Sequence, residues 1–191
     1  MNPSTLLSLL FTVSLIGICH ARPLRVASPS PSPSPSPSRK TKLYQIVCKD
    51  AGKDNGRCLK LLEAYPKITS AKDYVKLCKY TLKMAVKKSI KGQNYLQKVM
   101  KKNPSRAIKQ CATFDYDGLV LSFKSSLGEL VESPDTANYD AKVAGDGPVN
   151  CQRALDADKI VNRSISKLNN EMEFLSLVAF LATNHLPQTL Q

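Results

Sequence analysis

Residues 107–131 read AIKQCATFDYDGLVLSFKSSLGELV and predict the helix on which the rest of the fold depends. Apolar side chains recur along this stretch at steps of three or four residues, which is the period of one buried helix face. They are Ile108, Ala112, Tyr116, Leu119, Phe123, Leu127 and Leu130. A second strip of small residues would let neighbouring backbones approach: Gly118, Ser122, Ser125, Ser126 and Gly128. We expect this helix to pack between two others in a bundle, with part of its surface available for docking on another protein.

Two further long segments have the same helical period. Apolar residues at three-four spacing predict helices over residues 71–102 and 158–185, with Val161 among the core positions of the second. Ser70 followed by Asp73 resembles a capping box at the start of the first of these helices.

Shorter helical segments complete the pattern. Residues 136–157 predict a less regular helix, interrupted by GDGP at residues 145–148, and residues 42–65 contain two short helical pieces separated by a turn. Nothing shows the period-two alternation of strands. The sequence therefore predicts an all-α fold, an antiparallel up-and-down four-helix bundle preceded by an N-terminal helical hairpin.

The N-terminal residues are different in composition. An uncharged apolar run in residues 1–21 is too short to span a bilayer and ends in small residues, which predicts a signal peptide cleaved after Ala21 and a secreted, extracellular product. Strict Ser-Pro alternation makes residues 22–38 a linker, because proline fixes its backbone angle and removes a donor. Residues 39–191 then form one folded domain, and no transmembrane segment is expected.

Five cysteines follow the leader, which in an oxidising compartment implies two disulfides and one free thiol. Cys48 and Cys58 flank the turn of the hairpin, so a disulfide between them would staple it. In an antiparallel helix pair, residues equidistant from the turn lie side by side, and the midpoint of Cys111 and Cys151 is residue 131, where the helix ends. We expect this second pair to be bonded and Cys78 to be the free thiol, buried in an apolar stripe.

The net charge of +13 is unevenly distributed. Residues 39–102 carry 18 Lys and Arg against 4 Asp and Glu, whereas residues 103–191 carry 8 against 11. Such a cationic surface is consistent with a solvated face that binds nothing. It is also consistent with binding to an acidic polysaccharide or an anionic membrane, which in a secreted chain are favoured over nucleic acid. A stripe of lysines occupies the solvent side of the helix over residues 71–102: Lys72, Lys76, Lys79, Lys83, Lys87 and Lys91.

Residues suited to catalysis are scarce. His185 is the one histidine after the leader, and the sequence has no nucleophile, phosphate-binding or metal-binding motif. Asp115 and Asp117 lie two apart on one helix and do not face each other, and we expect Asp115 to accept a hydrogen bond near the disulfide. We expect no enzyme activity, no cofactor and no metal, and interpret the chain as a binding protein. Asn162 begins an N-glycosylation sequon.

Several segments in this order resemble the plant inhibitors of pectin methylesterase and acid invertase, over residues 43–186. The resemblance rests on the hairpin cysteines, on AIKQCATFDYDGLVLSF with Gly118 near the family's small position, on YDAKVAGDGPVNC and on AFLATNHL. It implies a four-helix bundle behind a hairpin, with one disulfide in the hairpin and one between the second and third bundle helices. It also implies a stoichiometric complex that covers the enzyme's substrate cleft, in the apoplast or cell wall.

The resemblance favours pectin methylesterase as the target, because the Pro-Lys-Phe tripeptide frequent in invertase inhibitors is absent from the region of Tyr139. Inhibition of acid invertase is the alternative. By analogy the contact surface would include residues on the second and third helices: Lys124, Glu132, Tyr139, Asp140 and Lys142. A second alternative is a surface protein without inhibitory activity that holds acidic pectin through four lysines of the stripe: Lys76, Lys79, Lys83 and Lys87.

Overall fold

The structure is a computed structural model in which residues 41–187 are described. The predicted signal peptide, residues 1–21, and the predicted linker, residues 22–38, lie outside the described residues. No helix within residues 41–187 combines the length and the apolar character that crossing a membrane requires.

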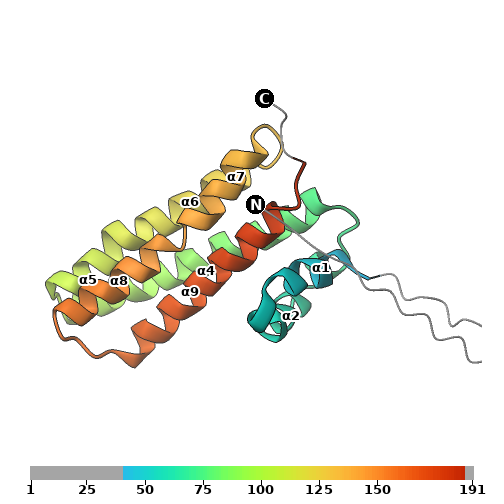
Figure 1. Ribbon diagram of the computed structural model, residues 1–191. Helices are drawn as coiled ribbons and strands as arrows, with labels where there is room; N and C mark the ends of the chain where they lie inside the picture. Colours follow the sequence, from blue (N-terminus) through green and yellow to red (C-terminus); the bar gives the residue numbers. More distant parts are fainter. Residues whose placement is uncertain (1–40, 188–191) are drawn as a thin grey trace, which may run out of the picture. The chain divides into compact units, whose positions relative to one another are not determined.

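Helices form the whole of the described chain, apart from turns and loops (Figure 1). The hairpin consists of α1 (Leu43–Asp50), a 3₁₀ turn at Gly52–Asp54, and α2 (Asn55–Glu63), followed by the short α3 (Pro66–Thr69). The bundle consists of α4 (Tyr74–Lys102), α5 (Arg106–Gln110), a π-helical turn η2 (Cys111–Asp115), α6 (Tyr116–Gly128), α7 (Pro134–Val143), α8 (Asp146–Ala157) and α9 (Arg163–Thr183).

Four helical rods make the bundle. The second rod is α5, η2 and α6 in succession, and the third is α7 followed by α8 (Figure 1). α4 packs beside α6 and α9, and α7 also packs beside α6 and α9, so α4 and α7 lie diagonally across the core. The predicted all-α, up-and-down four-helix bundle behind a helical hairpin is confirmed.

The second rod buries the predicted face but is not one regular α-helix. Tyr116 and Phe123 are fully buried, and the other residues of that face are buried or half-buried. Cys111–Asp115 is π-helical, which adds a residue to one turn and rotates the segments before and after it relative to each other. Apolar spacing predicts a helix here but does not distinguish an α turn from a π turn, so the sequence missed this feature.

Two helix starts differ from the prediction. α4 begins after Asp73, whose side chain accepts a hydrogen bond from the backbone N–H of Lys76 at 2.8 Å. Ser70 does not cap α4, because it ends α3 and donates its hydroxyl to the carbonyl of Pro66. The prediction at Ser70 was wrong because α3, a single turn, is too short to show a helical period.

α9 begins five residues later than predicted. Asn162 caps it, since its side-chain oxygen accepts hydrogen bonds from the N–H groups of Ser164 and Ile165. The preceding loop contains Lys159 with a φ of 54°, a left-handed backbone that interrupts any helix. Val161 therefore lies outside the core and is 91% exposed, so its assignment to the buried stripe was wrong.

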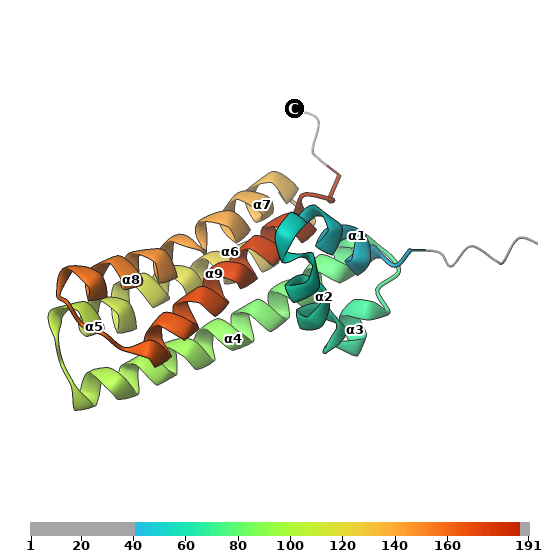
Figure 2. The same ribbon diagram turned by 60° about the horizontal axis from the view of Figure 1, so that its bottom comes forward.

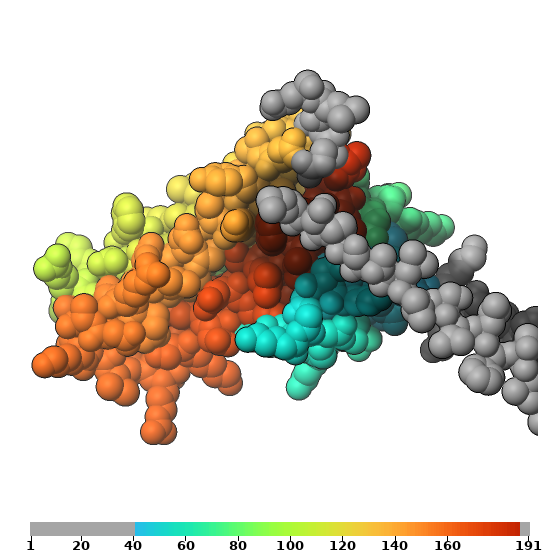
Figure 3. Space-filling view, viewed as in Figure 1, coloured from blue at the N-terminus to red at the C-terminus, as the bar shows by residue number. Residues whose placement is uncertain are grey.

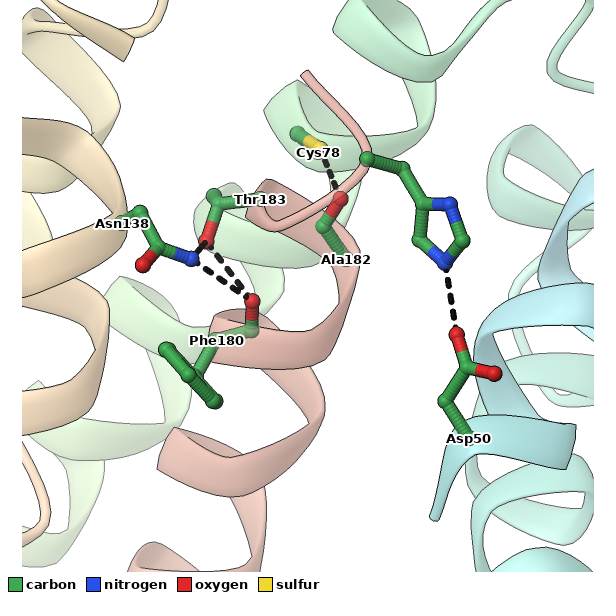
Figure 4. A network of polar contacts seen from close by, with 7 residues as sticks. Asp50, Cys78, Asn138, Phe180, Ala182 and Thr183 are labelled. Carbon is green, nitrogen blue, oxygen red and sulfur yellow. Dashed lines mark hydrogen bonds and ion pairs between the residues drawn. The ribbon is translucent and has the colours of Figure 1, made fainter. Parts of the chain in front are cut away.

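Polar contacts join α1, α4 and α7 to the C-terminal end of α9 and the residues just after it (Figure 4). The side-chain amide of Asn138 on α7 donates to the Phe180 carbonyl at 3.1 Å and to the Thr183 hydroxyl at 3.0 Å. Just beyond α9, His185 contacts Asp50 of α1 at 2.7 Å and stacks on Tyr74 at the start of α4. The histidine therefore links the hairpin to the bundle.

The cysteines form the predicted pairs. Cys48–Cys58 closes the hairpin, and Cys111–Cys151 joins η2 to α8 across a Cα–Cα distance of 4.7 Å. Cys78 is a free, buried cysteine whose sulfur donates to the Ala182 carbonyl at 3.1 Å. Burial raises the pKa of the Cys78 thiol to about 12, so it stays protonated and unreactive at ordinary pH.

The two disulfides differ in the loop that each closes, with separations of 40 residues for Cys111–Cys151 and 10 for Cys48–Cys58. Chain entropy assigns about 4 kcal/mol to the first and about 3 kcal/mol to the second. Replacing both Cys111 and Cys151 by Ala should therefore lower the free energy of unfolding in urea more than replacing both hairpin cysteines by Ala. An equal or larger loss from the hairpin pair would contradict this ranking.

Candidate functional site

The five predicted contact residues do not converge on one point. Tyr139 on α7 is 64% exposed, Asp140 beside it is half-buried, and Glu132 is exposed in the turn between α6 and α7. Lys142 is exposed, but its ammonium lies 5.7 Å from the ring centre of Phe180, on the side of α7 that faces α9.

Lys124 is also exposed, on α6. Asp117 hydrogen-bonds Gln93 of α4, and Lys124 follows Asp117 by two helical turns, so both lie on the α4 side of α6. Tyr139, Asp140 and Glu132 are therefore the predicted residues that remain near the α6/α7 boundary.

A set of exposed apolar residues was missed by the sequence analysis. Phe114 is 77% exposed, Leu121 63% and Val131 68%, and all three lie on η2, α6 or the turn after it. With Tyr139 they are, after Val161, the most exposed large hydrophobic side chains of residues 41–187. We call Phe114, Leu121, Val131 and Tyr139 the docking face, because large apolar residues left exposed on neighbouring elements mark interaction sites.

A shallow groove runs beside two of these residues, between α6 and α8. It has a volume of about 420 Å³, and the residues that shape it include Phe114, Asp115, Gly118, Leu121, Val143 and Gly147. Phe114 and Leu121 stand along it as exposed ridges. Carboxylates on Asp115, Asp117 and Asp146 make the groove acidic as well as apolar.

α8 approaches the second rod most closely at Gly147. A Cβ atom at this position would lie 2.3 Å from the carbonyl oxygen of Asp115, which no side chain could tolerate. The sequence marked this glycine only as a helix interruption. By contrast, a Cβ at Gly118 or Gly128 would meet no atom within 4 Å, so the predicted close approach along the small-residue strip was wrong at these two positions. Ser126 of that strip is buried and donates to the Ala137 carbonyl of α7.

Asp115 lies at the base of the groove and is 3% exposed. It is beside the Cys111–Cys151 disulfide as expected. The side chain of Gln110, the residue before Cys111, is near enough to act on the carboxylate as a hydrogen-bond donor, although neither oxygen has a partner at full hydrogen-bond geometry among the described residues. Burial raises the pKa of Asp115 to about 6, and the side chain of Gln110 acts in the opposite direction without cancelling that effect. The groove beside Phe114 and Leu121 therefore has a buried carboxylate at its base.

Asp115 and the two cysteines of the disulfide, Cys111 and Cys151, place one oxygen and two sulfur atoms within 4.8 Å of one another. Because both sulfurs belong to the disulfide, they are not thiolates, and Asp115 is left as the one anionic donor in this cluster. Cys111, Asp115 and Cys151 therefore do not fit a metal site in the oxidised protein.

The remaining predicted positions are at the surface. Asn162, the predicted glycosylation residue, is half-buried at the start of α9, and its occupancy remains a prediction. In the lysine stripe, Lys76 is paired with Asp73 at 3.0 Å, while Lys79, Lys83 and Lys87 are exposed on α4.

The solved structures that are similar to this chain include two inhibitors. One is a mutant form A of a pectin methylesterase inhibitor from Arabidopsis, with a TM-score of 0.67, 18% identity, and coverage of 78% of this chain and 100% of that one. The other is a pectin methylesterase inhibitor from Arabidopsis thaliana, with a TM-score of 0.56, 18% identity, and coverage of 76% and 97%. The chain has the fold of these inhibitors. No family model and no curated protein sequence matches it.

The buried carboxylate predicts a specific pH dependence of stability. The pKa of Asp115 is about 6 in the folded state against 3.8 for an ordinary aspartate, so the folded state binds this proton more tightly. The contribution of the protonated Asp115 side chain to the free energy of unfolding is therefore greatest below about pH 4. It falls as the pH rises toward 6 and is lost above that. Asp115→Asn removes the ionisation.

We expect Asp115→Asn to be more stable than the wild type at pH 8, by up to about 3 kcal/mol, and nearly equal to it at pH 4. Urea unfolding at both pH values measures the difference. Asp117→Asn, which alters an exposed carboxylate two residues away, is the control and should show no such pH-dependent gain. Equal stabilities of wild type and Asp115→Asn at both pH values would contradict the assignment.

Proposed function

We propose that this protein is a secreted, extracellular inhibitor that binds a plant pectin methylesterase through the docking face and blocks access to its substrate cleft. It would act by occupying the cleft, without catalysis of its own. Two observations support this choice of partner. The chain shares its fold with two pectin methylesterase inhibitors, and several of its sequence segments resemble inhibitors of this enzyme.

The observation that carries the proposal is the exposed apolar surface on the second and third rods. A monomeric bundle has no need of Phe114 and Leu121 on its outside, since neither contributes to the core. Interfaces gain most of their affinity from a few central aromatic and aliphatic anchors that enter pockets on the partner. Phe114 and Leu121, which flank the groove between α6 and α8, have the character and position of such anchors.

The structure also supports a rigid docking face. η2 is attached to α8 by the Cys111–Cys151 disulfide, and α7 is attached to α9 by Asn138 and by the Ser176 hydroxyl, which donates to the Ala141 carbonyl at 2.7 Å. A surface held in its binding conformation loses less conformational entropy on association, which favours a tight complex.

Titrating the full chain into a plant pectin methylesterase at mildly acidic pH tests the function, with an acid invertase titrated in parallel. We expect pectin methylesterase activity to fall to a minimum at a stoichiometric ratio, while invertase activity is retained. Inhibition of the invertase alone would move the assignment to the alternative target. Full activity of both enzymes with the inhibitor in excess would disprove the inhibitor proposal.

The docking face is tested with Phe114→Ala and Leu121→Ala. Each should weaken inhibition by about tenfold or more, the effect of losing one interface anchor. Ile90→Ala is the matched control, because Ile90 is an exposed aliphatic residue on α4 and lies off the docking face. Equal inhibition by Leu121→Ala and Ile90→Ala would place the contact elsewhere on the molecule.

A further inference from the structure

A second groove lies between α4, α9 and the hairpin, on a different side of the bundle from the docking face. It consists of two depressions of about 310 Å³ and 300 Å³, both bordered by the ion pair between Lys88 of α4 and Glu171 of α9. We call it the basic groove and define it by Arg57, Lys60, Tyr65, Lys88, Lys91 and Tyr95. Figure 2 shows α4 and α9 side by side with α2 next to them.

The basic groove has an excess of positive charge. Four cationic side chains border it, and Glu171 is the one acidic residue among those that line it. Glu171 is already paired with Lys88 at 2.5 Å. Among the described residues Arg57, Lys60 and Lys91 make no ion pair, so three positive charges remain to attract an anion.

Arg57, on α2 of the hairpin, is held in place by residues of α9. Its Nη2 donates to the backbone carbonyl and side-chain oxygen of Asn170 at 3.0 and 2.9 Å, and its guanidinium carbon lies 3.8 Å from the ring centre of Phe174. Figure 3 shows the hairpin against one side of α9. The N–H groups on Nε and Nη1 make no hydrogen bond to the described residues, so an ordered guanidinium faces the groove with donors available.

Aromatic rings are placed at both ends of the groove. Tyr65, half-buried, borders the depression near the hairpin, and Tyr95, 37% exposed, borders the other depression. Aromatic faces pack against the C–H faces of sugar rings, while cations pair with carboxylates. A ligand that offers both groups at intervals along a chain is a linear polysaccharide of uronic acids.

We propose that the basic groove binds a linear acidic polysaccharide, of which de-esterified pectin is the example. Arg57, Lys60 and Lys91 would pair with carboxylates on successive sugars, and Tyr65 and Tyr95 would support sugar rings. A chain fits a recess better than a membrane does, because Lys88 is set into the groove with its side chain only 29% exposed. A flat lipid surface would first meet the exposed lysines of α4 that do not line the groove, among them Lys79, Lys83 and Lys87.

The basic groove and the docking face would be usable at the same time. α4 and α9 form one side of the bundle, whereas α6 and α7 form the side across from it. The protein would then be retained on the polysaccharide while the docking face stays open to a partner. This inference goes beyond the proposed inhibition and does not require it.

Binding of oligogalacturonides to the full chain, measured by isothermal titration calorimetry, tests the proposal. The groove variant combines Arg57→Gln, Lys60→Gln and Lys91→Gln. The control combines Lys79→Gln, Lys83→Gln and Lys101→Gln, which removes the same three charges from exposed positions on α4 that do not line the groove. Thermal unfolding verifies that both variants are folded, and Tyr95→Ala provides an uncharged second variant.

We expect the groove variant to lose about tenfold or more in affinity, and the control to lose less than about threefold, because isolated exposed charges are screened by salt. Tyr95→Ala should also weaken binding, and fully methyl-esterified oligogalacturonide should not bind. Equal losses in both triple variants would overturn the proposal in favour of diffuse attraction. Binding to phosphatidylserine vesicles that depends on the groove, with no binding of oligogalacturonide, would overturn it in favour of a lipid site.

Discussion

The Cys111–Cys151 disulfide is the constraint on which the candidate binding surface depends. It holds η2 against α8, four residues from where Gly147 allows α8 to reach the backbone of Asp115. The π-helical turn lies at this junction and rotates the helix between its two α-helical parts. At this junction Phe114 is exposed while Asp115 next to it is buried. A covalent link, a glycine contact and one irregular turn thus meet where the exposed ring of Phe114 adjoins the buried carboxylate of Asp115.

The uneven charge of the sequence has a spatial counterpart. Within the cationic segment, residues 41–102 form the hairpin and α4, which border the basic groove. The mildly acidic residues 103–191 supply η2, α6 and α7, which carry the docking face. The bundle topology separates these surfaces, because α4 and α7 lie diagonally across the core. One face is therefore suited to an apolar protein contact and the other to a polyanion, with little interference between them.

Much of the fold could be predicted, since the period of Ile108 to Leu130 identifies a buried face and the midpoint of Cys111 and Cys151 identifies a helix pair. The residues of the candidate site could not be predicted in this way. Phe114 and Leu121 lie off the apolar stripe, and periodicity reports only the residues that point inward. Arg57 and Lys91 are far apart in the sequence, and they line the same groove only because the hairpin folds onto α9. Val161 was misplaced because its spacing fits a helix that the Lys159 backbone and the Asn162 cap prevent.

The most direct test of the central claim is hydrogen–deuterium exchange of the full chain with and without a pectin methylesterase. If η2 and α6 dock on the enzyme, amides in residues 111–124 and in α7 should exchange more slowly in the complex, while α4 and α9 around the basic groove should be unchanged. Protection confined to α4, α9 or the hairpin would contradict the account, because the enzyme would then bind the opposite side of the bundle.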